Sequence, residues 1–407
     1  MTTDKRPMRL ARSILAGTLL PWAAPALAQT TTATFNHGIN ITRLFDSPPV
    51  APVNPAAPYK AWQTELSAAE LVRLHQAGFD FVRLPIDPGF FLDADATSSK
   101  NGLTQIIVFL HTLMADGFSV IVDMHPRPGS PDWSPQLTLD SLTGPKFTKY
   151  AQFVSSLAGR LAAEHTNRLI LELMNEPQMC VTPSGPDWTV FQQQLIAGAR
   201  KVAPTLGLVV TGSCYSSIDG LAKLTVPKDP NIYVMVHFYE PFLFTHQGAP
   251  WSSISRYVAG VRYPMNTADQ PGTQAASAAY VNKTASATVA VATTQMQTQL
   301  NNYFATPFDA QAITKRFDQL ATWASAAGVP PSHVFIGEFG VMIQGGGFAG
   351  APADLAARAQ WMHDVSSAAT AHGFPWSVWG YHGQFGIVSD NPSRVLDPAV
   401  IQALFGP

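Results

Sequence analysis

Short apolar segments rich in β-branched and aromatic residues recur eight times along the chain. In order they are FNHGINI (35–41), FDFVRLPI (79–86), FSVIVDM (118–124), RLILELM (168–174), GLVVTG (207–212), NIYVMVHF (231–238), HVFIGEF (333–339) and FPWSVWG (374–380). Their near-continuous hydrophobicity is typical of strands in a parallel sheet whose outer face is covered by helices. The pattern therefore predicts eight strands that belong to one parallel sheet.

Amphipathic helical patterns separate most of these segments. One begins at Ser67, carries Glu70 three residues later and ends at Gly78, which indicates a capping box and a glycine C-cap. Further patterns cover 145–165, 187–203 and 309–328. Eight alternating β and α units predict an α/β fold of the (β/α)₈ TIM-barrel type. A doubly wound sheet also alternates, but no glycine-rich phosphate loop follows the first segment.

The connection after the sixth segment is out of scale with the others. About a hundred residues separate it from the seventh, whereas βα units usually need far fewer. The excess covers residues 240–307 and includes a stretch rich in Ala, Thr and Gln over 275–303. We interpret it as a partly helical insertion in the loop after strand 6, within a single domain.

The first 28 residues predict an export signal. An apolar run follows four basic residues, and Ala26, Leu27 and Ala28 form a small-x-small cleavage site before Gln29. The alternative is an uncleaved membrane anchor, for which the run is short. Cleavage would release residues 29–407 as a single-domain protein secreted to the periplasm or the extracellular space.

Composition and charge exclude several classes of protein. Hydrophobic residues make up 46% of the chain and charged residues 13%, which argues against disorder. The net charge of −2 offers no basic face for nucleic acid. No later stretch is long and apolar enough to span a membrane, so we expect no membrane contact after cleavage. Cys180 and Cys214 follow neighbouring strands, and an oxidising compartment would let them form a disulfide.

Polar and aromatic residues stand at the carboxyl ends of nearly every predicted strand, where such barrels place their active sites. They are Arg83, His125, Asn175, Glu176, His237, Tyr239, Glu338 and the tryptophans Trp376 and Trp379, of which we favour Trp379. Glu176 and Glu338 end strands 4 and 7 and would face each other across the mouth. Glycoside hydrolysis needs this arrangement, because one carboxyl protonates the leaving oxygen while the other attacks the anomeric carbon. Arg83 and Tyr239 would keep Glu338 ionised.

These segments resemble glycoside hydrolase family 5, a group of retaining β-glycanases that includes many cellulases. FVRLP, DMHP, LMNEP, HFY and GEFG occur in the family's order, and PWSVWGYHGQFGI looks like its eighth-strand segment. The resemblance implies that Glu176 is the acid/base and Glu338 the nucleophile. It also implies that substrate is positioned by Arg83, His125, Asn175, His237, Tyr239 and Trp379.

We therefore expect a monomeric, cofactor-free and metal-independent endo-β-1,4-glucanase that cleaves β-glucan chains. Three alternatives stay open: the same chemistry on mannan or mixed-linkage glucan, a catalytically silent carbohydrate-binding barrel, and a metal-dependent hydrolase. Glu172, in mid-strand, is expected to be structural. In the insertion, Phe244, His246 or Trp251 would contact sugar, unless this segment packs as a hydrophobic lid.

Overall fold

The computed structural model describes Met1 and residues 33–47, 49, 53–59, 66–180, 187–285, 289–343, 353–390 and 394–406. The chain divides into two units, Met1–Thr32 and Ala33–Pro407. The export signal predicted over 1–28 falls, apart from Met1, outside the described residues. Within the described ranges, we find no helix that has both the length and the apolar character of a membrane span.

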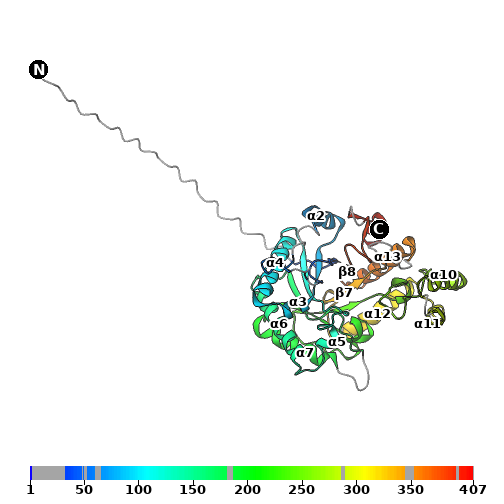
Figure 1. Cartoon of the computed structure of the whole chain (residues 1–407), viewed down its shortest axis with the longest axis horizontal. Helices are drawn as coiled ribbons and strands as arrows, with labels where there is room; N and C mark the ends of the chain where they lie inside the picture. Colours follow the sequence, from blue (N-terminus) through cyan, green and yellow to red (C-terminus); the bar gives the residue numbers. More distant parts are fainter. Residues whose placement is uncertain are drawn as a thin grey trace. The chain divides into compact units, whose positions relative to one another are not determined.

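Eight parallel strands close into a barrel, in the order in which they follow one another along the chain (Figure 1). They are β1 (His37–Asn40), β2 (Phe81–Ile86), β3 (Ser119–Met124), β4 (Leu169–Glu172), β5 (Gly207–Thr211), β6 (Ile232–His237), β7 (Val334–Phe339) and β8 (Trp376–Trp379). β1 pairs with both β2 and β8 and so closes the ring. Each predicted segment contains one strand, and the predicted (β/α)₈ barrel is confirmed.

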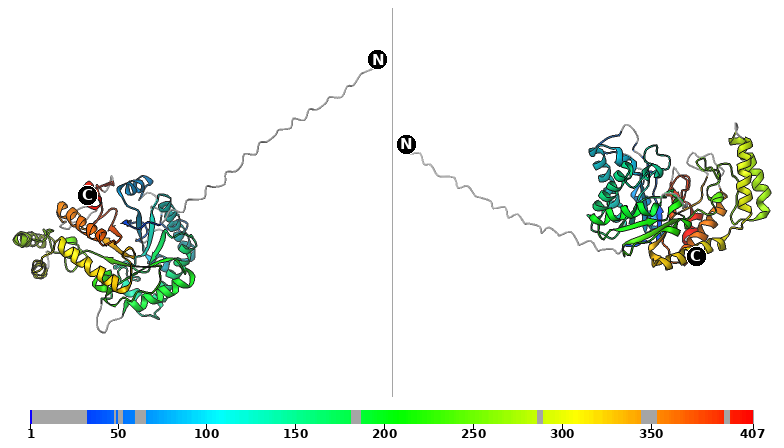
Figure 2. Two further views of the ribbon diagram at one scale, coloured as in Figure 1. Left: turned by 180° about the vertical axis from the view of Figure 1, so that it is seen from behind. Right: turned by 90° about the horizontal axis from the view of Figure 1, so that it is seen from below.

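Helices surround the barrel, and further helical segments lie in the loops and in the insertion after β6 (Figures 1 and 2). They are α2 (Ala68–Ala77), α3 (Pro88–Asp93), α4 (Ala96–Ala115), α5 (Pro135–Thr138), α6 (Pro145–Ala162), α7 (Trp188–Val202), α8 (Ser213–Ser216), α9 (Phe242–Thr245), α10 (Gln270–Thr284), α11 (Val289–Phe304), α12 (Ala310–Ala327), α13 (Leu355–Ala371) and α14 (Pro398–Phe405). α2 begins and ends as its sequence predicts. Ser67 and Glu70 form a reciprocal capping box, and Gly78 ends the helix with a left-handed φ of 114°.

The interior of the barrel consists of an apolar layer below a polar one. Six buried apolar side chains form the lower layer: Phe81, Ile121, Ile170, Val209, Met235 and Phe335. Successive side chains alternate between the two faces of a strand, so the residue two positions further along also points inward. At five of the six strands that residue is polar and buried: Arg83, Asp123, Glu172, Thr211 and His237. These five side chains form a polar layer beneath the mouth of the barrel, which we call the polar floor.

The long connection after β6 contains a partly helical insertion, as predicted. It contains α9, the 3₁₀ turn Thr267–Asp269, α10 and α11, and it ends before α12, which packs on the barrel. α10 and α11 pack side by side, and they lie farther from the barrel than α12 does (Figures 1 and 2). A second short element follows β8, where β9 (Val388–Asp390) pairs antiparallel with β10 (Val395–Leu396).

Candidate active site

Arg83, in the middle of β2, is fully buried and organises the polar floor. Its Nε and Nη2 donate to the two carboxylate oxygens of Glu172 at 2.7 and 3.0 Å. Its Nη1 donates to Glu338 Oε1 at 2.7 Å and to Asn40 Oδ1 at 2.9 Å, while Nη2 also donates to Asn175 Oδ1 at 2.8 Å. Because a guanidinium can only donate, it fixes which oxygen of each partner faces it.

Carboxyl groups outnumber cations around Arg83. Asp123 Oδ2 lies 3.0 Å from Arg83 Nη2, so three buried carboxyls, those of Asp123, Glu172 and Glu338, share one guanidinium. Burial raises the pKa of all three carboxyls, that of Asp123 to about 7. Burial also disfavours the charged guanidinium, but the three carboxylates raise the pKa of Arg83 well above its ordinary value. Arg83 therefore stays charged.

Glu338, near the end of β7, is held from two sides. Arg83 donates to Oε1, and the Tyr239 hydroxyl donates to Oε2 at 2.9 Å. Burial raises the pKa of this carboxyl, while the positive charge of Arg83 opposes that rise. Two donors aimed at the two oxygens stabilise the carboxylate form and hold it in one orientation, as a nucleophile requires.

Glu176, just after β4, has a different environment. No guanidinium contacts it, and its hydrogen-bond partner within the described structure is His237, whose Nδ1 lies 2.7 Å from Oε1. Burial raises the pKa of Glu176 to about 7, although its side chain keeps 24% of its surface exposed. A raised pKa and access to solvent suit a group that must carry a proton to the substrate. The residue also has a left-handed φ of 41°.

His237, at the end of β6, bridges the two glutamates. Its Nδ1 lies 2.7 Å from Glu176 and 3.5 Å from Glu338 Oε2. Burial lowers the pKa of His237 to about 4, so the imidazole is neutral near pH 7. A proton on Nδ1 satisfies the oxygen of Glu176 that faces it, and this leaves the other oxygen to carry the acidic proton outward.

The amide of Asn175 is oriented by the same guanidinium. Since Oδ1 accepts from Arg83, the Nδ2 donor faces away, toward His125 Nε2 at 3.4 Å. His125 is held in turn by Asp123, which lies 2.7 Å from Nδ1. The His125 ring stacks on Trp379 with 5.5 Å between centroids and 10° between planes. Trp376, the less favoured tryptophan, is buried.

The structure thus brings all eight expected active-site residues to one mouth: Arg83, His125, Asn175, Glu176, His237, Tyr239, Glu338 and Trp379. Sequence reasoning missed two buried partners of Arg83, Asn40 and Asp123. Their signal was alternation within the strand: Asp123 lies two residues before His125, and Asn40 lies two residues after Gly38 at the end of β1. Glu172 is fully buried and accepts hydrogen bonds from Arg83, which fits the structural role expected of it.

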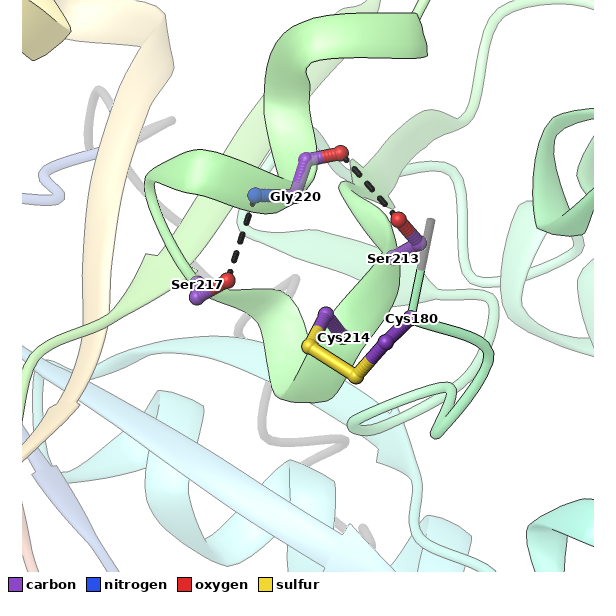
Figure 3. Close-up of a disulfide and its surroundings, with 5 residues drawn as sticks. All are labelled: Cys180, Ser213, Cys214, Ser217 and Gly220. Carbon is purple, nitrogen blue, oxygen red and sulfur yellow. Dashed lines mark hydrogen bonds between the residues drawn. A yellow bond between two sulfur atoms is a disulfide. The ribbon is translucent and has the colours of Figure 1, made fainter. Parts of the chain in front are cut away.

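Cys180 and Cys214 form a disulfide between the loops that follow β4 and β5 (Figure 3). The pair is the one that the neighbouring strands led us to expect. Cys180 lies four residues after Glu176, so the bond anchors the segment that carries this glutamate.

One group of side chains in the described part of the chain has the composition of a metal site, and it coincides with the candidate active site. One ligand atom each from Glu176, His237 and Glu338 lies within 4.8 Å of the other two. These atoms could bind a divalent cation, but they are also the groups that metal-free hydrolysis needs. Metal independence stays a prediction, which activity in the presence of a chelator tests.

Two of the three insertion residues expected to contact sugar are inside the protein. Phe244 is fully buried, and His246 lies in an aromatic cluster where burial lowers its pKa to about 3. His246 stacks on Phe242 and meets the edge of Tyr239. At these positions the packed-lid alternative fits better, whereas Trp251 is 56% exposed, and its contact with sugar stays a prediction.

Comparison with known proteins gives a consistent picture. The family model Cellulase (glycosyl hydrolase family 5) matches residues 48–384. Endoglucanase 3 of Fibrobacter succinogenes is 25% identical over 370 residues, which are 87% of this chain and 50% of that protein. Endoglucanase C of Acetivibrio thermocellus is 30% identical over 208 residues, 50% of this chain and 59% of that protein. The chain thus spans little more than half the length of these relatives.

Among solved structures, Thermotoga maritima Cel5A has a similar fold. Its complex with cellobiose has a TM-score of 0.65 and 19% identity, covering 91% of this chain and 97% of that one. A complex of the same protein with mannotriose gives a TM-score of 0.64 and 18% identity with the same coverage.

Proposed function

The chain belongs to glycosyl hydrolase family 5, and we propose that it is a secreted endo-β-1,4-glucanase that cleaves β-glucan by double displacement. The observation that carries the proposal is the approach of Glu176 and Glu338: one carboxylate oxygen of each lies within 4.8 Å of the other, and His237 Nδ1 lies close to both residues. Retaining glycosidases separate their carboxyls by about 5–5.5 Å, whereas inverting enzymes leave about 6.5–9.5 Å for a water. The spacing supports retention.

In the first step, Glu338 attacks the anomeric carbon and forms a glycosyl ester, while Glu176 gives its proton to the leaving oxygen. In the second step, Glu176 takes a proton from water, the resulting hydroxide attacks the same carbon, and Glu338 leaves as a carboxylate. The assignment follows from the different environments of the two groups. Burial raises the pKa of both carboxyls, but Glu338 receives hydrogen bonds from a cation and a phenol, whereas Glu176 has neither and keeps more of its surface exposed.

The Nδ2 of Asn175 and the stacked pair of His125 and Trp379 support the sugar whose bond is cleaved. An amide donor held by Arg83 suits a 2-hydroxyl, a contact that strengthens in the transition state. The aromatic face of Trp379 suits the C–H face of a pyranose, and His125 backs this ring at 5.5 Å.

A panel of polysaccharides tests the substrate. We expect carboxymethylcellulose to be cleaved fastest, with a fall in viscosity that runs ahead of the release of reducing ends, because internal cleavage shortens chains before it frees small sugars. Mannan and mixed-linkage glucan are the other substrates in the panel. Mannan is included because Thermotoga maritima Cel5A, which has a similar fold, has been solved with mannotriose. Preference for mannan would replace the glucanase assignment, and no cleavage of any glycan would favour a silent binding barrel.

A further inference from the structure

The first turn of the insertion after β6 folds back behind Tyr239, whose hydroxyl donates to Glu338 Oε2 at 2.9 Å. α9 begins three residues after Tyr239, and its last residue, Thr245, returns to that tyrosine. The Thr245 side chain is fully buried, and its hydroxyl donates to the carbonyl oxygen of Tyr239 at 2.7 Å. The insertion therefore holds the main chain of the residue that contacts the proposed nucleophile.

His246, the next residue along the chain, completes this contact. Its Nδ1 lies 3.0 Å from Thr245 Oγ1. A hydroxyl has a single proton, and that of Thr245 is directed at Tyr239, so His246 Nδ1 is the donor to Thr245. Burial lowers the pKa of His246 to about 3, which keeps the ring neutral with its proton on Nδ1. The hydrogen bonds thus run in one direction, from His246 through Thr245 to Tyr239.

The ring of His246 also supports the ring of Tyr239. The two rings meet edge to face, with 4.9 Å between centroids and 75° between planes. His246 in turn stacks on Phe242, with 4.0 Å between centroids. Phe385, from the loop after β8, lies 5.1 Å from the His246 ring and 5.9 Å from the Tyr239 ring. The phenol is therefore held by its neighbours as well as by its main chain.

The loops after β7 and β8 are tied to the same group. Met342, in the loop after β7, donates its backbone N–H to Thr245 O at 3.0 Å. The next residue, Ile343, donates its backbone N–H to Gln384 O at 2.7 Å, which links this loop to the loop after β8. The three loops are thus joined around the strand that carries Glu338.

The support of Tyr239 bears directly on the proposed nucleophile. Arg83 holds one oxygen of Glu338 and Tyr239 holds the other. Tyr239 lies two residues beyond the end of β6, and the hydrogen bond to its carbonyl oxygen comes from Thr245 instead of a neighbouring strand. A catalytic group keeps its productive geometry only when the residues that contact it are themselves fixed by packing and hydrogen bonds.

We propose that Thr245 and His246 are positioning residues for the nucleophile Glu338, and that they act through Tyr239. Both side chains are buried, so they act from behind Tyr239 and not on the sugar. The inference rests on the proposed glycosidase function, and it gives the insertion after β6 a part in the chemistry at the mouth of the barrel.

A double-mutant cycle tests the proposal. The rate measured is kcat/KM for a dinitrophenyl β-glycoside of the disaccharide unit that the panel selects, because its first step needs the nucleophile but little help from the acid. Thr245→Val keeps the shape of the side chain and removes its hydroxyl. It should lower kcat/KM about tenfold in the parent background, as expected for coupled residues. In a Tyr239→Phe background it should lower kcat/KM less than about twofold, because the contact through which it acts is already gone.

Three further variants serve as rescue, second test and control. Thr245→Ser restores the hydroxyl and should restore the parent rate. His246→Ala removes the ring and the Nδ1 donor, so its loss should also largely disappear in the Tyr239→Phe background; this variant decides the question if Thr245→Val does not fold. Val281→Ala is the matched control, because it opens a cavity at a buried position of α10 in the same insertion. It should lower the melting temperature and leave kcat/KM unchanged.

The contrary results are distinct. If the parent protein is active but Thr245→Val and His246→Ala lose as much in the Tyr239→Phe background as in the parent, they act on the fold alone and the positioning role is wrong. The role is also wrong if neither variant loses activity, or if Thr245→Ser stays as slow as Thr245→Val. If the parent protein hydrolyses neither the aryl glycoside nor any polysaccharide of the panel, the proposed function fails, and the positioning role fails with it.

Discussion

Arg83 donates a 2.7 Å hydrogen bond to Glu338, and both side chains are buried beneath the mouth of the barrel. The same guanidinium is held along its other edge by both oxygens of Glu172. A bidentate pair of this kind fixes the plane of the guanidinium. The orientation of the candidate nucleophile therefore depends on a carboxylate that does not face the substrate.

The two glutamates should respond differently to the leaving group. Glu338→Ala removes the proposed nucleophile and should be nearly inactive on every substrate. Glu176→Ala removes only the proposed acid, so aryl glycosides with good leaving groups should recover much of the rate of the first step, since they need no protonation. The measurement is the dependence of kcat/KM on the pKa of the leaving group. The same dependence in both variants would overturn the assignment of roles.

The ionisation of Glu176 should determine how kcat/KM depends on pH. Its pKa is raised to about 7, so the acid stays protonated up to that pH, and kcat/KM should fall as the pH rises through about 7. The alkaline limb should be absent in Glu176→Gln when an activated aryl glycoside is the substrate. Asp123 also has a pKa of about 7, which makes Asp123→Asn the matched control. Survival of the limb in Glu176→Gln and its loss in Asp123→Asn would move the titration to Asp123.

Removing Arg83 should be costly to stability. Arg83→Met leaves Asp123, Glu172 and Glu338 buried without their cation, a change that typically costs about 3–5 kcal/mol. Urea unfolding near pH 7 measures it. Arg160→Met is the control, because the i,i+4 pair of the exposed Arg160 with Glu164 should contribute about 1 kcal/mol or less. Equal losses in the two variants would show that the buried cluster does not depend on Arg83.

The disulfide should stabilise the fold through the loop that it closes. The sequence separation of 34 corresponds to about 3–4 kcal/mol in the chain-entropy model. Replacing Cys180 and Cys214 together by Ala should lower the melting temperature, and activity should fall at temperatures where the fold is intact, because the Glu176 segment loses its anchor. Thiol titration of the unfolded, unreduced parent should find no free thiol. Two thiols per chain would rule the bond out.

Much of this architecture could be predicted from the sequence, because its signals are local. The strands are buried on both faces and therefore stand out as apolar runs, and the helix from Ala68 to Ala77 has its cap residues in place. Residues at strand ends such as Glu176 and Glu338 interrupt those runs, which makes them visible. Because the carboxyl ends of parallel barrel strands meet at one face, these residues are expected to lie on one rim.

What the sequence concealed depends on contacts between distant residues. Asp123 and Asn40 lie within or at the end of strand segments, and only barrel closure shows that they meet Arg83. The left-handed run from Cys214 to Ser216 contains no glycine, so no local signal marks it; bonds to the loop after β4 impose it. Similarly, the burial of Phe244 follows from the packing of the insertion.

The stereochemistry of the first product tests the paired roles of Glu176 and Glu338 most directly. Double displacement inverts the anomeric carbon twice, so a β-linked substrate must first give the β-anomer. Proton NMR, recorded before mutarotation equilibrates the sugars, distinguishes the anomers by the coupling of H1. We predict that the β-anomer appears first and the α-anomer grows in later; early appearance of the α-anomer would contradict the mechanism.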